Sequence, residues 1–311
     1  MKLQKIVFGL LLICIWPITI VAQQDTLRLL HLSDLHLIFN NEQFHPALAA
    51  NRKVYENGVA PFRHFMQTVP AEIGADFVIV NGDLIDFYDG VLPSGEMFAY
   101  QIEQFVDLIE EFTSPVLYVL GNHDIVSYGW SGSGRTSSQH VAGIARAAFI
   151  RNAPAMRNGT FYHKLFKVGD VNYRILFIDN AFNALSAADG VVLPYIDKPQ
   201  LKWLEYQLKS NPDDIVIAVM HIPMDVESEN KEDVAEVYNL LREYPSVKMV
   251  LAGHQHINRI HDFHVSDGFI QVQTAAFALD RKSWRSIMLT ENSIVISLPG
   301  QTETEIVRPI R

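Results

Sequence analysis

The sequence contains almost no cysteine. Its single thiol, Cys14, lies inside an apolar stretch near the N-terminus. A chain with one cysteine cannot form an internal disulfide, so a packed core rather than covalent crosslinks must stabilise its fold. Hydrophobic residues make up 49% of the chain and charged residues 19%. This composition is typical of a globular protein with a substantial core.

Positive charge is also scarce. The chain has 25 Lys and Arg against 35 Asp and Glu, which gives a formal net charge of −10. Proteins that bind nucleic acid usually present a basic surface, so this balance argues against a nucleic-acid partner. It also raises the question of how such a chain would attract an anionic substrate.

The N-terminus has the pattern of an export signal. Lys2 and Lys5 precede an uncharged apolar stretch at residues 6–22. This pattern predicts a signal peptide over residues 1–22 with cleavage after Ala22, and therefore an exported protein, either periplasmic or secreted. Loss of the two lysines would change the net charge from −10 to −12.

An alternative for this segment is an uncleaved membrane anchor. Ile20, three positions before the expected cleavage site, is not the small residue that cleavage prefers. The apolar stretch is near the lower length limit for a spanning helix and contains Pro17, which favours removal over anchoring. We therefore expect no stable membrane span after cleavage.

The remainder of the chain is predicted to form a single domain over residues 23–311, because it has no repeat, low-complexity tract or linker. Six short, apolar, β-branched segments recur, and each ends in polar residues. They cover residues 27–34, 75–83, 115–124, 173–180, 214–223 and 247–256. Continuous apolar segments of this length are typical of strands that are buried on both faces.

Amphipathic helical patterns lie between several of these strands, at residues 97–112, 198–210 and 232–244. After residue 256 the pattern changes to short apolar segments separated by turn residues, which predicts antiparallel strands. Alternating strands and helices followed by a β-rich tail indicate a layered α/β sandwich.

Five of the six predicted strands end in potential metal ligands. In such sheets, ligands bind beyond the carboxyl ends of the strands, where these side chains would meet. The residues are Asp34 and His36 of "SDLH", Asp83 of "NGD", Asn122, His123 and Asp124 of "GNHD", His221 of "MHIP", and His254 and His256 of "GHQH". Each motif alone is explained by a turn or a hydrogen-bonded histidine, but five together predict a metal centre.

The series "DLH", "GD", "GNHD", "H" and "GHQH" resembles the calcineurin-like metallophosphoesterase superfamily, over nearly the whole of residues 23–311. The helical pattern before "VMHIP" is similar to that of the secreted and cyclic-nucleotide-phosphodiesterase-like branch. This resemblance implies a four-layer αββα sandwich with two mixed β-sheets.

The resemblance also implies two divalent or trivalent metal ions. One would be held by Asp34, His36, Asp83 and His256, and Asp83 would bridge to a second held by Asn122, His221 and His254. Imidazole and oxygen ligands suit Mn, Fe, Zn and Co alike, so the identity of the ions stays open. The purple acid phosphatase branch has a tyrosine three residues after the bridging aspartate. Asp86 stands there instead, so no tyrosinate-to-iron colour is expected.

A bridged pair of ions implies hydrolysis of phosphomonoesters or phosphodiesters, in which a metal-activated hydroxide attacks phosphorus. His123 is outside the ligand set and is predicted to protonate the departing oxygen or to stabilise charge on the phosphoryl group. Asp124 is predicted to orient His123. The alternative function is a non-catalytic, protein-binding scaffold of the same fold, which the complete ligand set disfavours.

One segment runs against the acidic balance of the chain. Residues 125–169 contain no Asp or Glu but six Lys and Arg, and they begin with a Gly/Ser-rich stretch. This composition predicts a mobile flap whose Arg135 contacts an anionic substrate. The alternative is a surface segment whose arginines pair with acidic neighbours. His31, inside the first strand, is expected to be a hydrogen-bonded core residue.

Overall fold

The computed structural model describes residues 25–132, 134–181, 196–224, 231–263 and 268–311. The predicted signal peptide, residues 1–22, lies outside the described residues. Within the described ranges, no helix combines the length and the apolar character that a membrane span requires.

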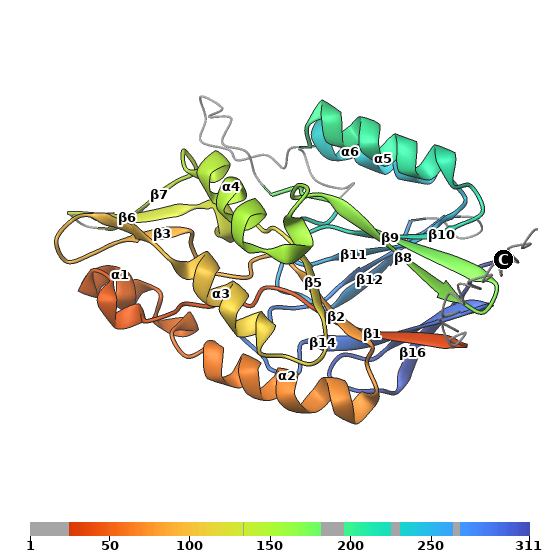
Figure 1. Cartoon of the computed structure of the whole chain (residues 1–311), viewed down its shortest axis with the longest axis horizontal. Helices are drawn as coiled ribbons and strands as arrows, with labels where there is room; N and C mark the ends of the chain where they lie inside the picture. The colour runs from red at the N-terminus through yellow and green to blue at the C-terminus, as the bar shows by residue number, and fades with distance from the viewer. Residues whose placement is uncertain (1–24, 133, 182–195, 225–230, 264–267) are drawn as a thin grey trace, which may run out of the picture.

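Two six-stranded sheets form the centre of the molecule (Figure 1). The first has the order β16-β15-β14-β1-β2-β5, and the second has the order β12-β13-β11-β10-β9-β8. The strands of the first sheet are β1 (Thr26–Leu32), β2 (Phe77–Asn81), β5 (Val116–Val119), β14 (Trp284–Thr290), β15 (Ser293–Ser297) and β16 (Thr304–Pro309). Those of the second are β8 (Tyr162–Val168), β9 (Val171–Phe177), β10 (Ile215–Val219), β11 (Val247–Ala252), β12 (Arg259–Asp262) and β13 (Ile270–Gln273).

In the first sheet, three parallel strands on one side join three antiparallel strands on the other, whereas the second sheet has a parallel centre and an antiparallel strand at each edge. The strands β1, β2 and β5 run parallel, and so do β9, β10, β11 and β13. The carboxyl ends of these parallel strands therefore lie on one side of each sheet. This shared direction brings the motif residues together.

A third sheet, of four short strands in the order β4-β3-β6-β7, lies beside the large ones. Its strands are β3 (Asp89–Val91), β4 (Met97–Ala99), β6 (Ser127–Ser131) and β7 (Gly134–Ser138). The Gly/Ser-rich start of the acid-free segment, the predicted flap, contributes strands β6 and β7, which pair as a hairpin of this sheet.

Helices cover the outer face of each large sheet (Figure 1). The longer ones are α2 (Val59–Ile73), α3 (Gln101–Glu110), α4 (Ala142–Asn152), α5 (Lys198–Ser210) and α6 (Lys231–Arg242). The shorter ones are α1 (Pro46–Asn51) and the 3₁₀ turns η1 (Asn41–Gln43), η2 (Lys53–Tyr55), η3 (His123–Ile125) and η4 (Pro154–Met156).

Three apolar clusters show why the layers stack in this order. Leu30 of β1 packs with Phe62 of α2 and Phe105 of α3 on the outer face of the first sheet. Its neighbour Leu29 points to the opposite face and packs between the two sheets with Ile217 of β10. Because successive strand side chains alternate, each strand of this kind contributes to two layers. The outer face of the second sheet packs on α5 and α6, so the predicted αββα sandwich is confirmed.

Two predicted elements differ from the structure. The helix expected over residues 97–112 begins only at Gln101, because Met97–Ala99 pairs with β3 as strand β4. In the β-rich tail, β13 pairs in parallel with β11 as well as antiparallel with β12, so it extends the parallel centre of the second sheet.

The core between the sheets predicts a specific stability cost. Ile217 is fully buried there, so Ile217→Ala removes three methyl or methylene groups from a packed site and should lower the free energy of unfolding by about 3 kcal/mol. Urea denaturation followed by circular dichroism measures this change. Val307→Ala is the matched control, because Val307 is 56% exposed and should change stability by less than about 0.5 kcal/mol. Equal losses in the two variants would contradict the assigned core.

Candidate metal centre

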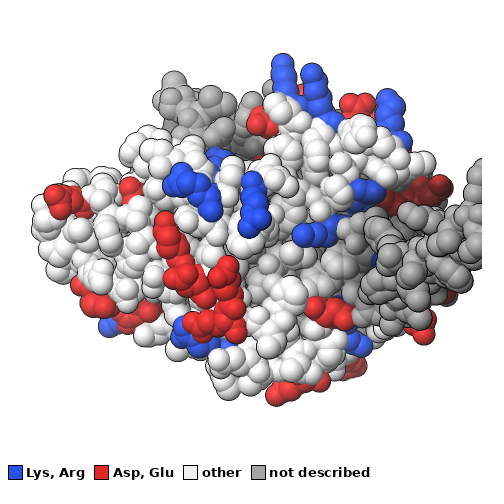
Figure 2. Space-filling model, in the orientation of Figure 1, with Lys and Arg blue, Asp and Glu red and all other residues white. Residues whose placement is uncertain are grey.

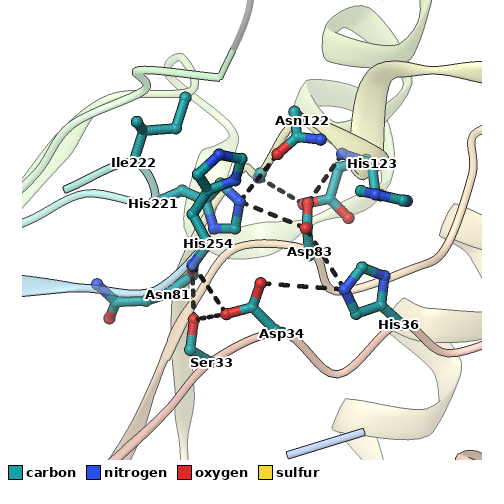
Figure 3. Close-up of polar contacts among 12 residues, drawn as sticks. Ser33, Asp34, His36, Asn81, Asp83, Asn122, His123, His221, Ile222 and His254 are labelled. Atoms are coloured by element: carbon teal, nitrogen blue, oxygen red, sulfur yellow. Dashed lines mark hydrogen bonds and ion pairs between the residues drawn. The ribbon is translucent and has the colours of Figure 1, made fainter. Parts of the chain in front are cut away.

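The motif residues lie at the carboxyl ends of β1, β2, β5, β10 and β11, where the two sheets meet (Figure 3). Backbone hydrogen bonds connect the segments that follow these strands. The backbone amide of His36 donates to the backbone carbonyl oxygen of Asp83 at 2.8 Å. The backbone amide of Gly253 donates to the backbone carbonyl oxygen of His221 at 2.9 Å. The segments are therefore held in register with one another.

The backbone at this edge adopts an uncommon conformation. Among the described residues, six non-glycine positions have positive φ, and five of them belong to the metal-ligand motifs. These five are Asp34 (54°), His36 (43°), Asp83 (48°), His254 (67°) and His256 (55°). Left-handed backbone costs an L-residue on the order of 1 kcal/mol or more, and such strain concentrates at functional sites. This backbone conformation directs the five side chains toward a common point.

Two motif glycines allow the closest approaches. A Cβ atom at Gly121 would lie 2.2 Å from Oδ1 of Asp83, and one at Gly253 would lie 1.7 Å from Oγ of Ser33. Neither position has space for a side chain, so the sequence must have glycine before "NHD" and before "HQH". These contacts press the end of β5 against Asp83 and the end of β11 against Asp34.

Four side chains form the first ligand group. Nε2 of His36 lies 3.6 Å from Oδ2 of Asp83 and 3.9 Å from Oδ1 of Asp34. Nε2 of His256 lies 3.1 Å from Oδ1 of Asp34 and 3.3 Å from Nε2 of His36. The potential ligand atoms of all four residues lie within 4.8 Å of one another.

This first group fits a cation. Oδ1 of Asp34 is buried without a well-formed hydrogen bond, although Nε2 of His256 is close to it. Buried polar atoms without partners are rare in native proteins, and an ion is one of the few groups that can satisfy them. Carboxylate oxygens and imidazole nitrogens are together a donor set for a first-row divalent metal.

A second group lies on the other side of Asp83. Nε2 of His221 is 3.3 Å from Oδ2 of Asp83 and 3.1 Å from Oδ1 of Asn122. Nδ1 of His221 donates to the backbone carbonyl of Asn81 at 2.6 Å, which leaves Nε2 with a lone pair for a ligand. The ring of His254 lies beside that of His221, with centroids 5.1 Å apart. Asp83 therefore contacts both groups through one carboxylate oxygen.

The electrostatics of the centre favour cations. Burial alone would raise the pKa of the Asp83 carboxyl, but His221, His123 and His36 hold that pKa well below its usual range. Burial opposes the charged form of His221, yet Asp83 outweighs burial and raises the pKa of His221 to about 9, so a cation that binds Nε2 must displace a proton from this ring. Burial and the neighbouring His221 lower the pKa of His254 to about 4. Ionised carboxylates and a neutral imidazole are the states that bind metal.

His123 lies next to this centre, but its partner is not the expected one. Its backbone amide donates to Oδ1 of Asp83 at 2.8 Å, and Nδ1 of its ring lies 2.9 Å from the backbone carbonyl of Asp86. Asp124 accepts instead from the amides of Ile85 at 2.9 Å and Gly121 at 2.6 Å. The expectation that Asp124 orients His123 is therefore wrong. The 3₁₀ turn η3 directs that carboxylate into the loop, and Asp86 takes the orienting position.

Asp86 and Arg52 are the two residues that sequence reasoning missed. Oδ1 of Asp86 lies 3.0 Å from Nδ1 of His36 and 3.4 Å from Nδ1 of His123. Arg52 holds the same carboxylate through two hydrogen bonds of 2.6 Å, from Nε and from Nη2. Tyr55, one turn further along, stacks on the His36 ring with centroids 4.4 Å apart. The signal for Asp86 was its place three residues after the "GD" aspartate, whereas nothing in the sequence marks Arg52.

The arginines of the acid-free segment, residues 125–169, differ in their surroundings. Arg146 of α4 pairs with Asp179 at 2.8 Å, as the structural alternative predicted. Arg135 of β7 instead lies over the ring of Tyr128 at 4.3 Å. Figure 2 shows Lys and Arg gathered around α4 and β8, and Asp and Glu gathered over α3 below them.

His31 lies within the first strand and has the expected core role. Its Nε2 lies 3.0 Å from Oδ1 of Asn81, and its Nδ1 lies 2.8 Å from Oγ1 of Thr274. Both ring nitrogens therefore have partners inside the protein, and the residue is fully buried. This prediction is confirmed.

Two sheets with Asp, Asn and His side chains at the shared carboxyl edge define a metal-dependent phosphatase fold. The sequence model of the calcineurin-like phosphoesterase family matches residues 27–258. The chain belongs to this family, and it is a hydrolase that acts on phosphoric ester bonds.

Relatives of known activity support the same family. The chain is 24% identical over 230 residues to a manganese-dependent ADP-ribose/CDP-alcohol diphosphatase of Arabidopsis thaliana, which covers 66% of this chain and 72% of the relative. It is 24% identical over 243 residues to the 3′,5′-cyclic adenosine monophosphate phosphodiesterase CpdA of Escherichia coli, which covers 76% of this chain and 72% of the relative. A dimetal phosphatase structure from Danio rerio shares the fold, with a TM-score of 0.62, 14% identity, and coverage of 92% of this chain and 99% of that one.

The position of Asp86 leads to a prediction about metal affinity. Asp86→Asn keeps the shape of the side chain but removes the charge that orients His36 and pairs with Arg52. Residues that orient a metal ligand in this way typically contribute about 10–100-fold to metal affinity or activity. Chelator competition should show weaker Mn²⁺ binding by this factor. Glu111→Gln, which disrupts only the exposed pair with Arg63, is the control and should bind like the wild type. Unchanged affinity in Asp86→Asn would contradict the orienting role.

Proposed function

We propose that the protein is an exported phosphoesterase that uses two metal ions to hydrolyse small phosphomonoesters or phosphodiesters. The observation that carries this proposal is the position of Asp83. Its Oδ2 lies 3.6 Å from Nε2 of His36 and 3.3 Å from Nε2 of His221, between two groups of potential ligands. Two dications can lie close together only where an anion is shared between them, and a carboxylate in this position can be shared.

The residues present fit such a pair of ions. One would be held by Asp34, His36, Asp83 and His256, and the other by Asp83, Asn122, His221 and His254. When bound, two ions of this kind neutralise charge on the phosphoryl oxygens and lower the pKa of water. The donors are imidazoles, carboxylates and one amide, so Mn, Fe and Zn all remain suitable.

His123 has the protonation state and the placement of a general acid. Burial disfavours its charged form, but Asp83 and Asp86 outweigh burial and raise the pKa of His123 to about 9. Cations bound at Asp83 would weaken its share of this effect, whereas Asp86 would still favour the protonated ring. Because Nδ1 can donate its proton to the carbonyl oxygen of Asp86, Nε2 is left to donate to the departing oxygen of a substrate.

The relatives support a class of substrate to test. One of the relatives is named as a cyclic nucleotide phosphodiesterase and another as a diphosphatase. This supports small phosphodiesters and organic diphosphates as substrates to test beside monoesters. A turnover screen with p-nitrophenyl phosphate, bis-p-nitrophenyl phosphate and cyclic AMP in the presence of Mn²⁺ separates these classes.

Export is supported by the charged and apolar pattern of residues 1–22. The intact mass of the protein isolated from its source tests this part of the proposal. A chain that begins at Gln23 agrees with cleavage after Ala22. A full-length chain in the membrane fraction agrees with the anchored alternative.

Removal of the shared carboxylate tests the two-ion proposal. Asp83→Asn should lower the metal content from two ions per chain to one or none, because the amide cannot neutralise two cations. Turnover should fall at least about a thousandfold, since both ions are needed to stabilise the reacting group. Elemental analysis of the purified protein measures the metal content, and Glu111→Gln is the surface control. Two ions per chain in Asp83→Asn would contradict the sharing of this carboxylate.

Replacement of His123 tests the acid. His123→Ala should lower turnover by about 10²–10⁴-fold while the chain still binds two ions, because no ligand is lost. The loss should be smaller for p-nitrophenyl esters than for alkyl esters, since nitrophenolate departs without a proton. If His123→Ala instead loses its metals, or if both kinds of ester lose the same activity, the role is misassigned.

A further inference from the structure

An exposed guanidinium lies one aromatic ring away from the proposed acid. Cζ of Arg135 is 4.3 Å from the centroid of the Tyr128 ring. The hydroxyl of that tyrosine lies 3.2 Å from Nδ1 of His123, and the two ring centroids are 6.0 Å apart. Tyr128 is buried, whereas Arg135 is exposed. The ring therefore forms a fixed support between the catalytic histidine and a cation at the surface.

The guanidinium of Arg135 has no carboxylate partner within the described part of the chain. Two other arginines in the region are neutralised, because Arg52 is held by Asp86 at 2.6 Å and Arg146 by Asp179 at 2.8 Å. Arg52 also lies over the Tyr128 ring, at 5.4 Å. Stacking of a guanidinium on a ring leaves its N–H groups directed outward at the edges. Those of Arg135 are therefore available to an anion from outside.

The hairpin presents these groups on one face. In the β6–β7 register, Trp130 is paired with Arg135 and Tyr128 with Ser137, so the four side chains lie on the same side of the hairpin. Tyr128 fixes that side as the one that faces His123. The ring of His45 stacks on Trp130 with centroids 6.2 Å apart and a 13° angle. An aromatic and cationic surface therefore adjoins the metal centre.

We infer that Arg135 and Tyr128 form a second anion subsite, which binds a phosphate group in the departing part of the substrate. This inference rests on the proposed function. It assigns a substrate class, organic diphosphates, which the enzyme should prefer over esters whose departing group carries no phosphate. Hydrolysis adds water across the bond between phosphorus and the bridging oxygen. The bridging oxygen takes the proton from His123, and the departing phosphate leaves with its charge facing Arg135.

The kinetic test compares two substrates that differ in the departing group. Arg135→Ala, Arg135→Lys and the control Arg151→Ala, an exposed arginine of α4, are assayed with Mn²⁺ on ADP-ribose and on bis-p-nitrophenyl phosphate. Arg135→Ala should raise KM for ADP-ribose about tenfold or more, because it removes a charge-assisted hydrogen bond. For bis-p-nitrophenyl phosphate, KM should change less than about twofold, and Arg135→Lys should lie between the alanine variant and the wild type. Equal effects on both substrates, or the same effect in Arg151→Ala, would overturn the subsite.

A binding test separates the subsite from the proposed function. Calorimetric titrations of the Mn²⁺-saturated protein with methylenediphosphonate and with methylphosphonate, which are not hydrolysed, should show at least about tenfold tighter binding of the former. Arg135→Ala should remove most of this difference. If the wild type hydrolyses neither ADP-ribose nor bis-p-nitrophenyl phosphate, yet shows the Arg135-dependent difference in phosphonate affinity, the subsite is supported and the proposed function fails. If the wild type hydrolyses ADP-ribose or bis-p-nitrophenyl phosphate, but Arg135→Ala still binds methylenediphosphonate more tightly than methylphosphonate, the subsite is wrong and the proposed function stands.

Discussion

A single buried carboxylate organises the centre of this protein. Asp83 accepts a hydrogen bond from the backbone of His123 through Oδ1, and through Oδ2 it contacts His36 on one side and His221 on the other. Burial of a charge is unfavourable unless partners surround it. The surrounding histidines meet that condition, and the absence of a side chain at Gly121 allows the end of β5 to approach the same carboxylate closely. Local backbone, electrostatics and sheet packing are therefore all constrained by one residue.

The two large sheets supply different parts of the site, so their relative position matters for function. Asp34, Asp83 and Asn122 follow strands of the first sheet, whereas His221, His254 and His256 follow strands of the second. Asn81 connects the two sheets directly. Its side-chain amide donates to the carbonyl of Met220 at 2.8 Å, and its own carbonyl accepts from Nδ1 of His221 at 2.6 Å. The apolar core between the sheets then holds this junction in place.

The sequence predicted the parts of the structure that local pattern determines. All six apolar segments form strands of the two large sheets, and the polar residues at their ends identified the metal-ligand candidates that the structure brings together. Prediction from the sequence failed for contacts that depend on how the loops between helices and strands are folded. Adjacency suggested Asp124 as the partner of His123, but Asp124 accepts from the amides of Gly121 and Ile85, and Asp86 lies beside His123 instead. Arg52 reaches Asp86 from a segment with no recognisable motif. The helix α4 was missed because its buried residues include the small side chains of Ala142, Ala145 and Ala148, which give little amphipathic contrast.

The left-handed backbone at Asp34, His36, Asp83, His254 and His256 has a consequence for how ions enter and leave. A loop that had to reorganise around each incoming cation would lose conformational entropy at that moment, and its affinity would be lower for that reason. Here neighbouring strands and glycine contacts already fix the torsion angles. The cage is thus shaped in advance, and exchange of one cation for another should leave the polypeptide almost unmoved. Discrimination among ions then depends on their radius and coordination preference, and on their supply in the surrounding medium.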